Sequence, residues 1–147
     1  MFTNIVPMES LRAIELFTHC DDTLLRKVSR LGTEVAAKER QVLAREGEPG
    51  REFYVIVDGC ADVRHRGTVI ATLGRGDFFG EMALVDGKPR SASVVATTPM
   101  IMYVFDPLEF FSLLDDFPPI SRKILGTLAG RLRLAQEEGP GFGEVGA

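Results

Sequence analysis

GDFFGEMALVDGKPRSASV, residues 76–94, sets glycine, acidic and basic residues at close spacing in a segment otherwise rich in small and β-forming residues. Its centre, GEMAL at residues 80–84, predicts a short helical turn between strands, and a helix N-terminus offers free N–H groups and positive potential to an anion. Further on, Arg90 supplies a guanidinium, Ser91 a hydroxyl and Ala92 a backbone N–H. Together these groups are the parts of a phosphate cradle.

Glu81 is a poor neighbour for a phosphate because both groups are negative. Its place makes sense if the carboxylate accepts hydrogen bonds from another part of the ligand, such as a sugar hydroxyl, and an anion that bears a hydroxyl is a nucleotide-like ligand. Simpler interpretations stay open, and spacing alone favours them. In these, Glu81 stabilises the first turn of a helix, Arg90 is a solvated surface arginine and Gly80 serves a tight turn.

The region around this stretch, residues 33–106, alternates short Val, Ile, Phe and Tyr runs with turns that contain Asp-Gly or Arg-Gly. This spacing predicts an antiparallel sandwich or barrel. The strand register can be predicted for one hairpin. With Arg66-Gly67 as a two-residue turn, Val63 faces Ile70 across the strand pair, and the two side chains share one face of the sheet.

Helical patterns flank the strands at both ends. Residues 9–31 carry apolar side chains at three- and four-residue spacing, with Asp21 or Asp22 as an N-cap and Gly32 as the stop. After the strands, Asp106-Pro107 provides an N-cap and a proline at the first helical position. Pro118-Pro119 ends that helix and begins a second.

The second of these helices is expected to run over about residues 119–138. Its apolar side needs a partner, either the β domain or a second copy of the same helix. The side chains expected there are Ile124, Leu125, Leu128, Leu132 and Ala135.

The whole chain is expected to form one domain, residues 1–138, followed by a glycine-rich tail, residues 139–147, that we expect to be disordered. It has 147 residues and a net charge of −4, which argues against a generic nucleic-acid binder. No apolar run approaches the length of a membrane helix and no secretory signal opens the chain, so we expect a cytoplasmic protein that contacts no membrane.

Few residues in the sequence are candidates for binding a metal or acting as a nucleophile. Cys20 and Cys60 are the two cysteines, and His19 and His65 are the two histidines. The histidines fall in different zones, so we expect no metal site, and His65 beside a hairpin turn is expected to face solvent. Cys60 is expected to pack in a strand rather than act as a nucleophile. We therefore expect no enzyme.

Residues 76–94 resemble the phosphate-binding cassette of cyclic nucleotide-binding domains, the family of the bacterial catabolite activator, protein kinase A regulatory subunits and cyclic-nucleotide-gated channels. The matching motifs are FGEMAL, residues 79–84, and PRSASV, residues 89–94. Upstream, REGEPGREFYVIVDGCADV resembles the family's glycine-punctuated strands. Downstream, LAGRLRLAQEE resembles the helix that closes over the ligand. The similarity covers roughly residues 11–138.

The resemblance implies an antiparallel β jelly-roll with N-terminal and C-terminal helices, which is a mainly β fold. It implies Glu81 on the ribose 2′-hydroxyl and Arg90, Ser91 and Ala92 on the cyclic phosphate. Strand residues would line the nucleobase side, and the last helix would lie over the base. The candidate ligand-binding residues are Gly80, Glu81, Met82, Ala83, Arg90, Ser91, Ala92, Val63, Ile70, Ala71, Arg131, Ala135 and Gln136.

Three departures from the family pattern stand out. Arg40 occupies a position that is commonly glycine, so the turn after the first strand is expected to differ. Ala135 stands where the catabolite activator has a hydroxyl residue, which puts selectivity for the base in doubt. The chain ends soon after Gln136 without a helix-turn-helix, so we expect no DNA binding.

The resulting hypothesis is a non-catalytic receptor module for a cyclic nucleotide, cAMP in preference to cGMP, that needs no cofactor. Its output would pass to an unidentified protein effector or through a homodimer of the C-terminal helix. That helix either stays docked or docks more firmly on binding ligand. The alternatives are a domain of the same fold that has lost the nucleotide and serves as a protein interaction unit, and a small hydrolase, for which the sequence offers no nucleophile–base pair.

Overall fold

The computed structural model describes residues 8–137 and confirms a mainly antiparallel β fold with flanking helices. Two four-stranded sheets form a sandwich in which the first strand pairs with the eighth, the second with the seventh, the third with the sixth and the fourth with the fifth. This nested pairing is the signature of a jelly-roll. One sheet contains β1 (Thr33–Ala37), β8 (Met100–Phe105), β3 (Phe53–Asp58) and β6 (Phe78–Phe79). The other contains β2 (Val42–Ala44), β7 (Ser93–Ala96), β4 (Ala61–His65) and β5 (Thr68–Leu73).

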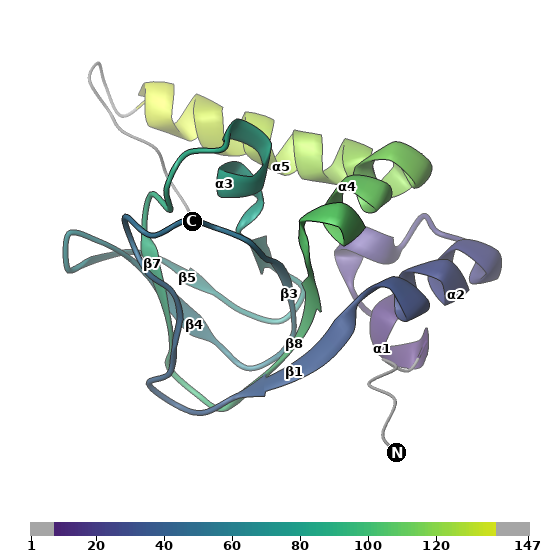
Figure 1. Ribbon diagram of the computed structural model, residues 1–147, viewed down its shortest axis with the longest axis horizontal. Helices are drawn as coiled ribbons and strands as arrows, with labels where there is room; N and C mark the ends of the chain where they lie inside the picture. The colour runs from purple at the N-terminus through teal and green to yellow at the C-terminus, as the bar shows by residue number, and fades with distance from the viewer. Residues whose placement is uncertain (1–7, 138–147) are drawn as a thin grey trace.

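The helices gather on one side of the sandwich, with α5 along the edge at the top of Figure 1. Residues 9–31, expected as one helical zone, divide into three pieces. Ile14, which is extended and fully buried, separates the first piece from the second. Asp21 caps the third piece by accepting a hydrogen bond from the Leu24 N–H, and Gly32 follows its last residue, as predicted. The pieces are α1 (Met8–Arg12), η1 (Glu15–Phe17) and α2 (Asp22–Leu31).

The other helices are α3 (Glu81–Asp86), α4 (Pro107–Asp116) and α5 (Pro118–Glu137). Asp106 and Glu109 form a complete capping box at the start of α4, with Pro107 at the first helical position. Phe117 leaves helical geometry directly before Pro118, so the expected break between the two helices is confirmed.

Two hydrophobic cores lie on the two faces of the sheet that contains β3, and the strand alternation sorts side chains between them. In β3, Phe53 and Val55 pack against the helices, whereas Ile56 packs between the sheets. Every strand contributes at least one side chain to the core between the sheets. The helix-facing core is rich in aromatic rings, and the Tyr103 hydroxyl donates a hydrogen bond to the Val28 carbonyl of α2.

The register predicted for the β4–β5 hairpin is wrong by one residue at its inner end. Arg66 and Gly67 both have positive φ, which suits a two-residue hairpin turn, and the strands pair correctly next to it. Between Val63 and Arg64 the register shifts, so that Val63 faces Ala71 instead of Ile70. The extra residue is a β-bulge, and it leaves Ile70 40% exposed while Val63 is buried.

The apolar residues expected on one side of the last helix are partly buried and partly exposed. Ile120 and Ile124 are buried in the helix-facing core and Leu128 packs against it, but Leu125 and Leu132 are exposed. The inward face of α5 is therefore narrower than the sequence pattern indicated. The tail expected to be disordered, residues 139–147, lies outside the described residues.

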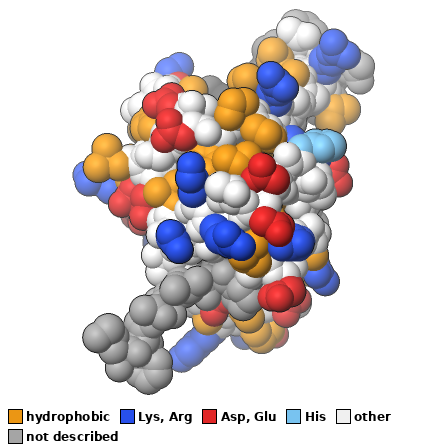
Figure 2. All heavy atoms as spheres, turned by 90° about the vertical axis from the view of Figure 1, so that its right-hand side faces the viewer, with side chains coloured by type: hydrophobic (Ala, Val, Ile, Leu, Met, Phe, Trp, Pro, Cys, Tyr) orange, Lys and Arg blue, Asp and Glu red, His pale blue; other side chains and the backbone are white. Residues whose placement is uncertain are grey.

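The surface mixes charges of both signs. Figure 2, which views the side that lies at the right of Figure 1, shows hydrophobic side chains in the upper middle of the face, with Lys, Arg, Asp and Glu side chains around them. None of the described helices is long and apolar enough to cross a membrane.

Gly32 allows a close approach that an alanine would prevent. Its φ is ordinary, but a Cβ there would collide with the rings of Tyr103 and Phe105. We expect Gly32→Ala to lower the free energy of unfolding by about 1–3 kcal/mol, as overpacked cores do. Gly126→Ala is the matched control, because a Cβ at Gly126 meets open space in α5 and alanine favours a helix. Urea unfolding of both variants measures the difference, and equal stabilities would contradict the close packing at Gly32.

Candidate functional site

The start of the cassette is fixed by two adjacent phenylalanines that point in opposite directions. Phe78 packs into the helix-facing core and Phe79 into the core between the sheets. Gly80 follows with φ of +97°, and a Cβ there would lie 2.7 Å from Nη1 of Arg90. Only glycine suits both the backbone conformation and this contact. The turn delivers Glu81, the first residue of α3, into the interior, where it is 0% exposed.

Arg90 lies beneath this turn and is 4% exposed. Its Nη1 donates to the Gly80 carbonyl at 3.1 Å, and its Nη2 donates to the Glu52 carbonyl at 2.9 Å. The Glu52 carboxylate is 3.9 Å from Nη2. Burial lowers the pKa of Arg90, and the nearby Tyr54 and Glu52 act in the opposite direction. The structure thus brings Gly80 and Arg90 together. Two backbone carbonyl oxygens fix the orientation of the Arg90 guanidinium.

The backbone of Arg90 is held as firmly as its side chain. The Arg90 N–H donates to the Glu48 carbonyl, and the Gly47 N–H donates to the Arg90 carbonyl, each at 2.8 Å. Both partners lie in the loop between β2 and β3. Sequence reasoning missed this loop as a part of the site, and it missed Glu52, because its charged residues have no spacing that sets them apart from a solvated turn.

Glu81 forms an ion pair with Arg131 of α5 through its Oε1. The Arg131 guanidinium also lies over the ring of Phe78, 5.6 Å from its centroid. The other carboxylate oxygen of Glu81, Oε2, is buried and has no hydrogen-bond partner among the described residues. Burial raises the pKa of Glu81, and Arg131 opposes that shift. A buried acceptor without a partner is costly, so Oε2 is a place where a ligand donor would be stabilised.

The remaining cassette residues border an open cavity of about 220 Å³. Met82 and Ala83 of α3 line it together with Ser91, so residues from both motifs meet there. Ala92, directly before β7, is buried in the core between the sheets. A second cavity, of about 270 Å³, lies on the side of Arg90 that faces the β2–β3 loop, and Glu52 and Tyr54 line it.

The residues expected to contact the base are less closely grouped. Val63 is buried between the sheets with Ala71 packed against the same core, whereas Ile70 is exposed at the bulge. Arg131, expected near the base, forms an ion pair with Glu81 in this structure. Gln136 is exposed on α5, and the side chain of Ala135 lies outside the part of the chain that the structure describes.

Comparison with known proteins identifies the family. The model of the cyclic nucleotide-binding domain matches residues 34–117. The Pycsar effector protein PaPycTIR of Pseudomonas aeruginosa is 36% identical over 110 residues, which cover 74% of this chain and 36% of that protein. The cAMP-dependent protein kinase regulatory subunit of Schizosaccharomyces pombe is 33% identical over 107 residues, covering 72% of this chain and 26% of that protein.

Comparison with solved structures finds the same fold in this family. The solved structure of PKAR CBD2 bound to Sp-2Cl-cAMPS is similar to this chain with a TM-score of 0.78 and 26% identity. The similarity covers 88% of this chain and 87% of that one. The curated relatives are longer, and this chain spans only 36% and 26% of the length of the two named above.

Proposed function

The chain belongs to the cyclic nucleotide-binding domain family, and on this premise we propose that it is a non-catalytic receptor module that prefers cAMP and signals through α5. The observation that carries the proposal is the buried pair of opposite charges in one cassette. Glu81 keeps one carboxylate oxygen without a partner, and Arg90 is directed by the turn that presents Glu81. Such a site offers an acceptor to a hydroxyl and a cation to a phosphate.

Each end of the ligand has a proposed partner. Arg90 binds the cyclic phosphate, helped by the Ser91 hydroxyl and the Ala92 N–H. A guanidinium has five N–H donors, and the bonds from Arg90 to the Gly80 and Glu52 carbonyls use two of them. Oε2 of Glu81 accepts a hydrogen bond from the ribose 2′-hydroxyl. Met82 and Ala83 add backbone N–H groups from the first turn of α3.

The preference for cAMP rests on the residues proposed for the base side. Val63, Ile70 and Ala71 have no polar side chain that would reward the extra hydrogen-bonding groups of guanine. A site without such a partner discriminates only modestly. Ser91 is compatible with either base, so we expect the preference for cAMP over cGMP to be small.

The output is proposed to leave through α5, because Arg131 links this helix directly to the carboxylate that would bind the ribose. Exposed Leu125 and Leu132 offer α5 an apolar surface for a protein effector or for a second copy of the chain. A module that receives a nucleotide and hands the signal to another protein also accords with the relatives, which carry the name of a kinase regulatory subunit and of an effector.

Titration of cAMP and cGMP by calorimetry tests the proposal. We expect both to bind, and Arg90→Ala to weaken cAMP binding by tenfold to a thousandfold, since each charge-assisted bond contributes about 1.5–3 kcal/mol. Arg90→Lys should recover only part of the loss, because an ammonium cannot form the fork. Lys38→Ala, at an exposed cation outside the cassette, is the matched control. Melting curves of each variant separate lost binding from lost folding. Unchanged affinity in a folded Arg90→Ala protein would refute the role of Arg90.

The role of Glu81 predicts discrimination at the sugar. 2′-Deoxy-cAMP should bind more weakly than cAMP, by a free-energy difference of about 1–3 kcal/mol, because it leaves the buried Oε2 without a partner. The difference should shrink in Glu81→Gln, whose neutral oxygen is a weaker acceptor. Competition binding of the two nucleotides measures both values. Equal affinities in the wild-type protein would exclude the ribose as the partner of Glu81.

The role of α5 predicts a change in amide exchange. A ligand shifts a conformational equilibrium only through differential affinity, and the contacts at Glu81 supply that difference if they stabilise the docked helix. Exchange over residues 125–136 should slow on adding cAMP, well beyond any change in α2. Arg131→Ala should reduce this slowing, because it removes the link between α5 and Glu81. Exchange that stays the same at saturating cAMP would show that α5 is not the switch.

A further inference from the structure

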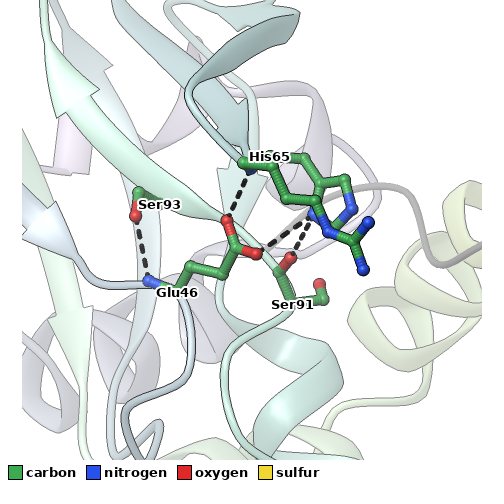
Figure 3. Close-up of polar contacts among 5 residues, drawn as sticks. Glu46, His65, Ser91 and Ser93 are labelled. Carbon is green, nitrogen blue, oxygen red and sulfur yellow. Dashed lines mark hydrogen bonds and ion pairs between the residues drawn. The ribbon is translucent and has the colours of Figure 1, made fainter.

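A polar cluster that joins the end of the cassette to two other segments holds the peptide group that is proposed to contact the phosphate. Figure 3 shows Glu46, His65, Ser91 and Ser93 in contact. These residues come from three separate segments, which are the β2–β3 loop, the tip of the β4–β5 hairpin and the end of the cassette. The three segments are far apart in the sequence, so the cluster forms only in the folded chain.

Glu46 connects the other two segments. Its N–H donates to the Ser93 hydroxyl at 2.9 Å, and its Oε1 accepts the Arg66 N–H at 2.9 Å. Its Oε2 is 3.4 Å from Nδ1 of His65. Arg66 has a φ of +51°, which is unfavourable for a residue with a side chain, and the bond to Glu46 helps to hold the turn in that conformation.

His65 was expected to face solvent, and its side chain is 42% exposed, but Nδ1 points inward. This atom is 3.1 Å from the Ser91 carbonyl oxygen as well as 3.4 Å from the Glu46 carboxylate. Both neighbours are acceptors, so Nδ1 carries the hydrogen and donates it. His65 is therefore a donor that fixes the direction of the Ser91 carbonyl.

The direction of that carbonyl decides the direction of the next N–H. In a planar trans peptide the C=O and the N–H point opposite ways, so a fixed Ser91 carbonyl fixes the Ala92 N–H on the other side. The neighbouring residues leave little freedom for the plane to turn, because Arg90 is bonded to the β2–β3 loop and Ser93 to Glu46.

We propose that His65 and Glu46 are positioning residues for the cyclic phosphate, which orient the Ser91–Ala92 peptide group through the Ser91 carbonyl. This role rests on the proposed function, in which the Ala92 N–H reaches a phosphate oxygen. It also joins the β4–β5 hairpin, which carries Val63 and Ala71, to the phosphate end of the site.

The test uses a pair of substitutions at His65. His65→Leu removes the donor, whereas His65→Asn places an amide N–H close to where Nδ1 lies. We expect His65→Leu to weaken cAMP binding by about threefold to tenfold, the range of one net hydrogen bond. His65→Asn should stay within about twofold of the wild type. Thr68→Val, at the exposed residue that faces His65 across the hairpin, is the control for damage to the hairpin itself.

Two further measurements separate positioning from general damage. His65→Leu should weaken cAMP and 2′-deoxy-cAMP by the same factor, because it acts at the phosphate end and leaves Glu81 unchanged. Combining it with Glu46→Gln should add less than the two separate losses, since the Glu46 carboxylate acts on the peptide through His65. A His65→Asn protein that binds as weakly as His65→Leu would overturn the proposal, and so would a change in the ratio between the two nucleotides.

Amide exchange without nucleotide distinguishes this inference from the proposed function. In His65→Leu the Gly47 and Arg90 N–H groups, which frame the peptide, should exchange faster than in Thr68→Val. Unchanged exchange together with unchanged cAMP affinity overturns the role of His65 alone. A wild-type protein that binds neither cAMP nor cGMP overturns the proposed function and with it any role in phosphate binding, whatever the exchange shows.

Discussion

The architecture of the site depends on keeping two opposite charges inside the protein. A charged side chain out of water is stable only where partners replace its hydration. Glu81 has Arg131 on one oxygen, and Arg90 has the carbonyls of Gly80 and Glu52. Each of these partners must be held in place by something else, so the requirement extends from the cassette to α5 and to the β2–β3 loop. The cassette is thus stable in the context of the whole domain rather than as an isolated segment.

The position of those charges is set by the two hydrophobic cores. Phe78 and Phe79 are consecutive, and in a strand consecutive side chains point to opposite faces. Because each ring is buried in a different core, a slip of the strand by one residue would turn each ring toward the other core and break both sets of contacts. The register of β6 therefore fixes where Gly80 turns and where Glu81 enters the interior. A short strand of two residues is enough for this purpose because both of its side chains are anchored.

The sequence pattern predicted the parts of the fold that depend on local chemistry. The Asp106 cap, the break before Pro118, the Arg66-Gly67 turn and the helical turn after Gly80 all follow from residue types at short spacing. What could not be predicted depends on contacts between distant segments. The bulge at Ile70 changes which residue faces Val63 without any local signal. Glu52 and Glu46 lie among other charged residues of one loop, and only the fold brings them to Arg90 and His65.

The same reasoning explains the last helix. Its apolar residues recur at helical spacing, but periodicity does not tell which of them meets the core, and Leu125 and Leu132 remain outside. The anchored part of α5 lies near its start, at Ile120 and Ile124, while Arg131 holds it further along. At about 1.5 Å per residue, Arg131 is roughly 16 Å and Glu137 roughly 25 Å from Ile120. A rotation of α5 about its buried start would therefore move the far end of the helix about one and a half times as far as the charge pair.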